Sequence, residues 1–363
     1  MSDIRLDSLK VSAFRIPTET PESDGTLEWN STTIIVVELA AGGACGLGYT
    51  YSDSAAAQLI DQKLRPLVVG RDPLDIESLW LSLRVETRNL GWPGIVATAI
   101  SAIDTALWDL KGKLLRMPLC KLLGAVRTEI PIYGSGGFTS YSLSQLTEQL
   151  RGWSAAGMRW VKMKIGRDAA ADLSRARAVR EAIGSETGLF VDANGAYDLK
   201  QALHQGRLLV EFGVSWFEEP VSSQDLEGLH FLRERLPAMM EVAAGEYGYE
   251  LANFHGLLGA GAVDVLQADI TRCGGITGFL KVSALAEAYR IPLSSHCAPA
   301  LHLHPACSVP RFRHAEYFYD HVRIEEKLFD GVALPVNGTL RPDLSHPGLG
   351  IELKHKDAER FSI

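Results

Sequence analysis

Eight short apolar runs, whose first residues lie 22 to 30 positions apart, constrain the fold of this 363-residue chain more than any other feature. They cover residues 130–134, 160–166, 189–194, 215–220, 241–246, 263–269, 291–296 and 314–318. The segments between them have helical patterns, and strands that alternate with helices form parallel βα units. Eight such units predict a closed (β/α)₈ barrel. An open, doubly wound sheet is the alternative that this rhythm alone leaves open.

The first 125 residues have a different pattern. β-rich runs at residues 4–16 and 31–51 flank a polar segment, residues 18–30, which we expect to be a loop. Helical patterns follow at about 53–66, 74–88 and 93–115, and the last has apolar positions spaced for a well-buried helix. These elements predict an α+β domain over residues 1–125.

The rest of the chain divides into two parts. The eight runs place the barrel over residues 126–330. The tail, residues 331–363, returns to Pro/Gly-rich and β-like sequence and has no place in an eight-unit barrel. We therefore expect it to pack back on the N-terminal domain.

Charge and composition exclude several classes of partner. With 36 basic and 44 acidic residues the net charge is −8, and no basic run is present, so neither nucleic acid nor an anionic membrane is expected as a partner. No apolar stretch reaches the length of a membrane-spanning helix, and the first residues are charged rather than signal-like. Five scattered cysteines without a CxxC pair predict a cytoplasmic protein and argue against a disulfide framework or a thiolate zinc site.

Ionisable residues end seven consecutive runs, at the carboxyl ends of the predicted strands. They are Lys162 and Lys164, Asp192, Glu218 and Glu219, Glu246, Asp269, His296 and Glu316. In a barrel, this end of the strands is the catalytic face. One such residue commonly caps the next helix, but an apolar strand gains nothing from a terminal charge that lacks a partner or a function. Seven in succession predict a shared site.

Three of these residues are carboxylates on successive units. Asp192, Glu218 and Glu246 are 26 and 28 positions apart, so we expect them to end adjacent strands and to face one centre. Neighbouring carboxylates repel one another unless a cation is bound. An all-oxygen ligand set with room for water and substrate favours Mg²⁺, with Mn²⁺ as a substitute. Salt bridges to arginines of the barrel are the alternative.

Lys162 and Lys164 lie on one face of a strand, because side chains alternate and Met163 points the other way. If both point into a barrel, each ammonium group disfavours the charge of the other, and burial adds to this effect. We therefore expect one lysine to have a lowered pKa and to act as a general base. A solvated edge strand with two surface lysines is the alternative.

Asp269 and His296 end adjacent predicted strands, 27 positions apart. An aspartate that accepts a hydrogen bond from one imidazole nitrogen fixes the tautomer and raises the basicity of the other nitrogen. We therefore predict an acid/base histidine facing the lysine pair across the metal. Such a site suits removal of the proton α to a carboxylate, because a metal and an ammonium group stabilise the enediolate that forms.

In these residues the chain resembles the enolase superfamily, and within it the mandelate racemase subgroup, whose sites use a Lys or His base with magnesium. The resemblance covers essentially the whole chain. It implies a modified (β/α)₇β barrel, with a capping domain formed by the N-terminal region and the tail. Residues 18–30 and 46–51 are similar to the two cap segments that close the active site in this family.

The resemblance also implies roles for individual residues. Lys164 matches the base of a KxK pair with Lys162. Asp192, Glu218 and Glu246 match the magnesium ligands, and Asp269 and His296 match the acid/base dyad. Glu316 matches an acidic residue that hydrogen-bonds the substrate carboxylate. A homo-oligomer is also implied.

Six further residues are candidates for substrate contacts: Trp29, Ser135, Asn194, Tyr247, His302 and His304. For several of them a structural role is an equal or stronger alternative. The two histidines follow the seventh predicted strand and either contact polyol hydroxyls or cap a helix. Ser135 lies in a Gly-rich segment that either holds an anion or simply turns.

The function expected first is dehydration of a sugar acid, an aldonate or aldarate, to a 2-keto-3-deoxy acid. Racemisation or epimerisation of a 2-hydroxy acid and cycloisomerisation of a sugar lactone are the alternatives within the same chemistry. A barrel that binds metal without catalysis is disfavoured because no acid/base residue is missing. A nucleotide-dependent oxidoreductase is disfavoured because the Gly259–Gly261 fragment lacks the third glycine and follows a helical pattern.

Overall fold

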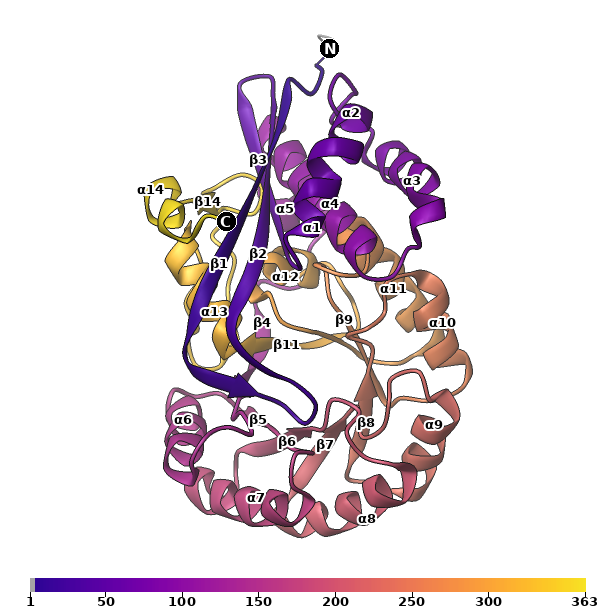
Figure 1. Ribbon diagram of the computed structural model, residues 1–363, viewed down its shortest axis with the longest axis vertical. Coiled ribbons are helices and arrows are strands. Elements are labelled where there is room, and N and C mark those ends of the chain that lie inside the picture. The colour runs from indigo at the N-terminus through magenta and orange to yellow at the C-terminus, as the bar shows by residue number, and fades with distance from the viewer. Residues whose placement is uncertain (1–3) are drawn as a thin grey trace.

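A computed structural model describes residues 4–363, and its ribbon shows a closed barrel with an N-terminal domain over one end (Figure 1). Each of the eight apolar runs forms a barrel strand. The strands are β4 (Ile130–Gly136), β5 (Trp160–Lys164), β6 (Gly188–Asp192), β7 (Val214–Glu218), β8 (Glu241–Ala244), β9 (Val265–Ala268), β10 (Leu293–Ser295) and β11 (Phe312–Phe318).

The ring is closed by hydrogen bonds between its first and last strands. Neighbouring strands pair in parallel and in chain order, and β11 pairs with β4 from Ala315↔Ile132 to Phe318↔Ser135. The predicted closed barrel is therefore confirmed, and the open doubly wound sheet is excluded.

A helix follows each barrel strand. These helices are α6 (Leu143–Ala155), α7 (Ala169–Ile183), α8 (Leu199–Leu209), α9 (Leu226–Arg235), α10 (Leu251–Gly259), α11 (Gly275–Tyr289), α12 (Pro299–Ala306) and α13 (Tyr319–Leu328), with a 3₁₀ turn η3 (Val210–Phe212) after α8. Polar residues fix where several of them begin. Ser142 and Asp198 form capping boxes with Gln145 and Gln201, which satisfy backbone N–H groups that have no partner within the helix.

The N-terminal domain is a three-stranded antiparallel sheet covered by helices. Its strands β1 (Ser8–Ser23), β2 (Glu28–Ala41) and β3 (Ala44–Tyr51) lie in the order β1-β2-β3. The helical elements are α1 (Ala55–Leu59), the π-helical turn η1 (Ile60–Leu64), α2 (Arg65–Val68), α3 (Ile76–Thr87), the 3₁₀ turn η2 (Arg88–Leu90), α4 (Ile95–Leu114) and α5 (Leu119–Leu122). Gly46 and Gly48 let β3 approach α4 closely, because a Cβ at either would lie within 2.3 Å of a helix carbonyl oxygen.

The polar segment 18–30 is not the loop that we expected. It continues β1 and begins β2, so that only residues 24–27 form a turn, and the long β1–β2 hairpin reaches over the open end of the barrel (Figure 1). The pairing shifts register between Pro17 and Glu22. Because β1 is an edge strand, its prolines interrupt no interior ladder.

The C-terminal tail contacts both parts of the molecule. Its strand β13 (Thr339–Leu340) pairs antiparallel with β4 of the barrel, and β14 (Glu352–Leu353) pairs with β12 (Phe329–Asp330). After α14 (His355–Ala358) and a 3₁₀ turn η4 (Glu359–Phe361), Ser362 bridges Phe14 of β1. Within residues 4–363, the structure contains no helix with both the length and the apolar character that a membrane span requires.

Candidate active site

Strand periodicity brings the functional side chains above an aromatic layer inside the barrel. Phe190 and Trp216 belong to a buried cluster that fills the barrel interior. Asp192 and Glu218 follow them by two positions, so they lie on the same inward face, one layer closer to the carboxyl end of the strands. Each of these two strands therefore contributes one side chain to the aromatic layer and the next inward-facing side chain to the layer of metal ligands.

The three predicted metal ligands converge. Asp192 ends β6, Glu218 ends β7, and Glu246 lies two residues beyond β8. One oxygen from each lies within 4.8 Å of the other two, and all three residues are buried. Burial, together with the charge of Asp192, raises the pKa of Glu218 to about 8. Hard oxygen donors this close suit a divalent cation such as Mg²⁺.

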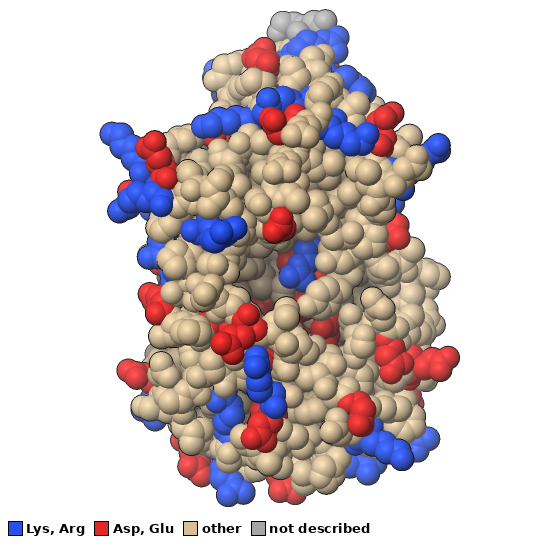
Figure 2. Space-filling model, in the orientation of Figure 1, with Lys and Arg blue, Asp and Glu red and all other residues tan. Residues whose placement is uncertain are grey.

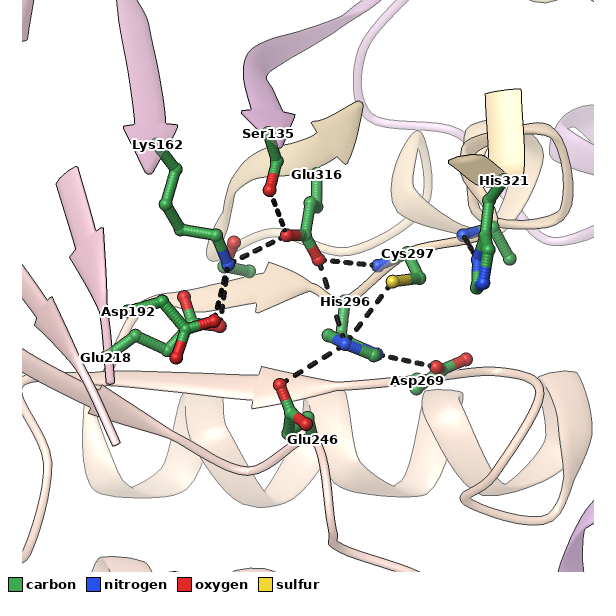
Figure 3. A network of polar contacts seen from close by, with 12 residues as sticks. Ser135, Lys162, Asp192, Glu218, Glu246, Asp269, His296, Cys297, Glu316 and His321 are labelled. Atoms are coloured by element: carbon green, nitrogen blue, oxygen red, sulfur yellow. Dashed lines mark hydrogen bonds and ion pairs between the residues drawn. The ribbon is translucent and has the colours of Figure 1, made fainter. Parts of the chain in front are cut away.

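Both lysines of the KxK pair point into the barrel and form ion pairs with carboxylates, as Figure 3 shows for Lys162. Lys162 Nζ lies 2.6 Å from Glu218 and 2.7 Å from Glu316, and Lys164 Nζ lies 2.5 Å from Asp192. The expectation of a lowered lysine pKa is wrong for this arrangement. Burial does favour the neutral amines, but the surrounding carboxylates outweigh burial and raise the pKa of both lysines.

Asp269 and His296 form the predicted dyad. His296 Nδ1 lies 2.7 Å from Asp269 Oδ2, and its Nε2 faces Glu246 at 3.2 Å (Figure 3). Burial opposes the charged imidazolium, but Glu246 and the bond to Asp269 outweigh it and raise the pKa of His296. Asp269 therefore fixes the ring through Nδ1, and Nε2 points toward the centre of the site.

Glu316 is held by donors on both of its oxygens. Its Oε1 accepts hydrogen bonds from Ser135 Oγ at 2.6 Å and lies 2.7 Å from Lys162 Nζ, while Oε2 accepts from the Cys297 backbone N–H at 2.9 Å. Ser135 is fully buried beneath this carboxylate. The expected substrate contact of Ser135 is therefore corrected to a supporting role, because its hydroxyl orients Glu316 instead.

A cavity of about 420 Å³ lies between the N-terminal domain and the barrel mouth. Figure 2 shows a hollow in the middle of the molecule with acidic and basic side chains at its edge. Of the predicted residues, those that line the cavity are Trp29, Lys164, Asn194, Glu246, His296 and Glu316. Lys162, Asp192, Glu218 and Asp269 are buried behind them. The cavity thus collects the predicted base, the histidine and one metal ligand.

Trp29 and Asn194, two of the predicted substrate contacts, both line this cavity. The Trp29 indole donates a hydrogen bond from Nε1 to Glu22 at 3.0 Å, which fixes the ring at the cavity wall. Asn194 has a left-handed backbone, with φ of +46°, and its Oδ1 is buried without a hydrogen-bond partner. It also lines a second cavity, of about 600 Å³, next to the first. Asn194 Oδ1 can therefore accept a hydrogen bond from a donor such as a ligand hydroxyl or a water molecule.

Three other predicted contacts do not line the central cavity, and two of them are corrected. His302 is fully buried in α12, where Nε2 accepts from the Ile270 N–H and Nδ1 donates to the Ala298 carbonyl. His304, also buried in α12, accepts from the Cys120 N–H through Nδ1. Both imidazoles therefore form hydrogen bonds with backbone groups, and we no longer expect them to contact the hydroxyl groups of a substrate. Tyr247 lines the second cavity and is half exposed.

Several cavity residues were not singled out in the sequence, although Tyr51 ends the predicted cap segment 46–51. Tyr51 ends β3 and stacks on His321, with ring centroids 3.4 Å apart, so the N-terminal domain and the segment after β11 form one wall. Arg272 lies 3.6 Å from Glu246 and 3.8 Å from Asp269. Its position three residues after Asp269 was a usable signal. The stacking of residues 270 positions apart was not.

Known families match this architecture. Residues 11–124 match the mandelate racemase/muconate lactonizing enzyme N-terminal domain, and residues 145–358 match the enolase C-terminal domain-like family. The chain is 33% identical to a 3,6-anhydro-alpha-L-galactonate cycloisomerase from Streptomyces coelicolor, over 99% of both chains. It is 34% identical to an L-talarate/galactarate dehydratase from Salmonella typhimurium, over 86% of this chain and 81% of the relative.

Solved structures agree with these matches. A mandelate racemase/muconate lactonizing enzyme-like protein from Rubrobacter xylanophilus superposes with a TM-score of 0.97 at 51% identity, over 99% of this chain and 100% of the other. A racemase from Streptomyces coelicolor, solved with bound magnesium, gives 0.93 at 33% identity over the same shares. Together with the carboxylate trio, the bound magnesium of that neighbour confirms the prediction of a Mg²⁺ cofactor.

Proposed function

Because the chain belongs to the mandelate racemase/muconate lactonizing enzyme family of the enolase superfamily, we propose that it removes the proton α to the carboxylate of a small polyhydroxy acid. The complete reaction is then dehydration of a sugar acid, an aldonate or an aldarate, to a 2-keto-3-deoxy acid. Asp192, Glu218 and Glu246 would hold Mg²⁺, which would supply Lewis-acid stabilisation of the negative charge that develops on the carboxylate.

One observation carries this proposal: two proton-transfer groups from separate strands face one cavity beside the metal ligands. Lys164 comes from β5 and His296 follows β10. Four strands separate β5 from β10 on one side of the ring and two on the other, so the two groups lie nearly across the barrel. A substrate bound between them has a proton acceptor on one side of its carbon chain and a proton donor on the other.

The roles of the side chains follow from their contacts. A cation held by Asp192 would offset the negative charge that raises the pKa of Lys164, so that neutral Lys164 can take the α-proton while the C–H electron pair moves toward the substrate carboxylate. Lys162, held by Glu218 and Glu316, places a positive charge beside that carboxylate. His296, protonated and oriented by Asp269, gives its proton to the β-hydroxyl, which leaves as water with its bonding electrons. The enol that remains ketonises to the 2-keto-3-deoxy acid.

Two alternatives have support of their own. Lys164 and His296 on different sides of one carbon also suit racemisation or epimerisation, in which one group removes the α-proton and the other returns a proton. A D-galactarolactone cycloisomerase, 30% identical to this chain over 95% of its length, supports cycloisomerisation of a sugar lactone as a third reaction. All three begin with the same α-proton transfer. The sugar-acid dehydratase among the relatives supports dehydration as the first choice.

We also propose a cellular setting and a division of the chain. Five free cysteines, among residues 4–363, are consistent with a cytoplasmic enzyme. A symmetric homo-oligomer, with no nucleic acid or membrane partner, fits a metabolic barrel of net charge −8. The capping domain comprises residues 1–125 and the tail 331–363, and the barrel comprises residues 126–330.

The decisive experiment follows sugar acids by NMR in D₂O. The Mg²⁺-loaded protein is incubated with a panel of aldonates, aldarates, 2-hydroxy acids and sugar lactones. A 2-keto-3-deoxy product supports dehydration. Deuterium at the α-carbon without loss of water would instead identify the reaction as racemisation or epimerisation. Lactone rearrangement would identify it as cycloisomerisation. If no acid exchanges its α-proton while Mg²⁺ is shown to be bound, the proposal is overturned.

A further inference from the structure

A cysteine that lines the cavity has no role in the proposed reaction. Cys297 follows His296 directly, and its Sγ lies 3.3 Å from His296 Nε2 (Figure 3). Its φ of +49° is rare for a residue with a side chain. The backbone N–H of Cys297 is held at 2.9 Å by Glu316. The fold therefore fixes a thiol beside Nε2, the nitrogen through which His296 exchanges protons.

The donors around this point have the spacing of a metal site. His296 Nε2, Cys297 Sγ and an oxygen of Glu316 all lie within 4.8 Å of one another. In detail, Nε2 is 3.3 Å from Sγ and 3.9 Å from Glu316 Oε2. Zinc bonds of about 2.0–2.3 Å in a tetrahedron place neighbouring donors roughly 3.3–3.8 Å apart. The observed separations need only small side-chain shifts to match.

A buried oxygen without a hydrogen bond points to the same place. Glu246 Oε2 lies 3.2 Å from His296 Nε2, yet it has no hydrogen-bond partner. Glu246 is only 3% exposed. A buried carboxylate oxygen normally has a donor, so a missing one calls for an explanation such as an ion. In neutral His296 the Nε2 lone pair is therefore available to a cation, and the Glu246 carboxylate beside it adds negative charge that favours a cation there.

We propose that His296, Cys297 and Glu316 form a second metal site, for a thiophilic divalent cation such as Zn²⁺, with water as the fourth ligand. A thiolate with an imidazole selects zinc-like ions, whereas the oxygen-only trio selects Mg²⁺. When the metal–sulfur bond forms, the S–H bond breaks and its proton leaves to solvent, without any redox change. No CxxC pair is needed, because one thiolate suffices here.

The consequence for catalysis rests on the proposed function. A cation on Nε2 occupies the lone pair with which His296 exchanges protons. Zn²⁺ should therefore inhibit the Mg²⁺ enzyme reversibly, without displacing Mg²⁺ from the carboxylate trio. The second site itself does not depend on which acid the enzyme uses.

The test uses Co²⁺ as a spectroscopic probe of the full-length protein in saturating Mg²⁺. Cobalt bound to Cys297 gives a thiolate-to-metal charge-transfer band in the near ultraviolet, and added Zn²⁺ should abolish it. Cys297→Ser and Cys297→Ala should lose the band and bind Zn²⁺ at least about tenfold more weakly. The control is Cys307→Ser, which removes a buried thiol that does not line the cavity and should keep the band.

Several outcomes overturn the proposal: no thiolate band in the wild type, a band that persists in both Cys297 variants, or Zn²⁺ inhibition that excess Mg²⁺ fully reverses. The last result places zinc in the carboxylate trio. If the band appears and is lost in the Cys297 variants, but no acid undergoes α-proton exchange, the metal site stands and the proposed function fails.

Discussion

His296 Nδ1 lies 2.7 Å from Asp269 Oδ2, and both side chains are buried at the barrel mouth. The second oxygen of Asp269 accepts a hydrogen bond from the Thr271 N–H at 2.7 Å, so the carboxylate is fixed in turn. A carboxylate in this position keeps a proton on Nδ1 and leaves Nε2 to exchange protons with a ligand. The orientation of the histidine thus depends on a residue that does not line the cavity.

Asp269→Asn should lower kcat/KM by about 10²- to 10⁴-fold, the usual contribution of an acid/base group. The amide retains the shape of the side chain but not the charge that favours protonated His296. The pH–rate profile should therefore lose activity at a lower pH than in the wild type. Steady-state kinetics across pH, with thermal melting as the folding control, test this. An unchanged profile contradicts the assigned role.

Lys164→Ala and His296→Asn should each reduce turnover by at least about 10²-fold while the fold persists. Each removes a proton-transfer group that faces the cavity, and neither side chain is part of the apolar core. Turnover and circular dichroism are measured for both. Lys281→Ala is the control, because that lysine pairs with Glu77 on the surface and should remain fully active. Normal activity in either site variant refutes its role.

The barrel and the inward-facing part of the site were predictable because they depend on local periodicity. Strand alternation puts Asp192 two positions above Phe190, and the repeat of βα units sets the carboxylates side by side. The combined effect of the neighbouring charges on the pKa of the two lysines was not predictable. Two neighbouring lysines suggested a lowered pKa, but only the folded chain brings Glu316 next to Lys162.

Features that depend on contacts between distant segments were also hidden. Nothing near Tyr51 in the sequence indicates that it stacks on His321. The rotation of α12 decides that His302 bonds to backbone rather than to a ligand. Polar composition, one proline and one glycine suggested a loop at 18–30, whereas an edge position in the sheet allows a strand there.

The tip of the β1–β2 hairpin fits against the barrel only because residue 25 is glycine. A Cβ on Gly25 would lie 2.6 Å from the Ala193 carbonyl oxygen and 2.7 Å from that of Ile165. Gly25→Ala should push the tip away from the cavity and lower kcat/KM by up to about 100-fold, because small misplacements are costly in catalysis. The melting temperature should change little.

Kinetics and thermal melts of Gly25→Ala should be compared with those of Gly152→Ala. Gly152 lies in α6 with open space around its Cβ position. Alanine there should leave kcat/KM unchanged and stabilise the helix slightly. Equal kcat/KM for the wild type and Gly25→Ala means that the hairpin does not close the site.

Glu325 should make the protein less stable as pH rises. Burial raises its pKa to about 8, and Tyr49 and the Ala300 N–H donate to its two oxygens. In the unfolded chain the same carboxyl ionises near its ordinary value of 4.5. Between these values unfolding releases a proton, so this contribution to stability is present below pH 4.5 and is lost as pH rises toward 8.

Glu325→Gln removes this ionisation. The melting temperature of the variant minus that of the wild type should therefore increase as pH rises from about 5 to 8. Thermal melts across this range test the slope. Glu326→Gln, an exposed neighbour, should melt in parallel with the wild type. Parallel curves for Glu325→Gln show instead that Glu325 is ionised in the folded protein.

The wall of the cavity formed by the N-terminal domain and α13 predicts a preference for monocarboxylic sugar acids. Asp24, Asp53 and Asp320 line this wall, and burial with the charge of Asp320 raises the pKa of nearby Glu22 to about 8. Arg272, the guanidinium that lines the cavity among the described residues, already faces Glu246 and Asp269. A second substrate carboxylate would thus meet like charge, which costs at least about 1 kcal/mol at contact distance.

An aldonate should therefore exceed the aldarate of equal chain length in kcat/KM by about tenfold. Asp53→Asn should reduce this ratio, because it removes one negative charge from the cavity wall. The control Glu86→Gln changes an exposed residue away from the cavity and should leave the ratio unchanged. Faster turnover of the aldarate contradicts this preference but leaves the α-proton chemistry intact.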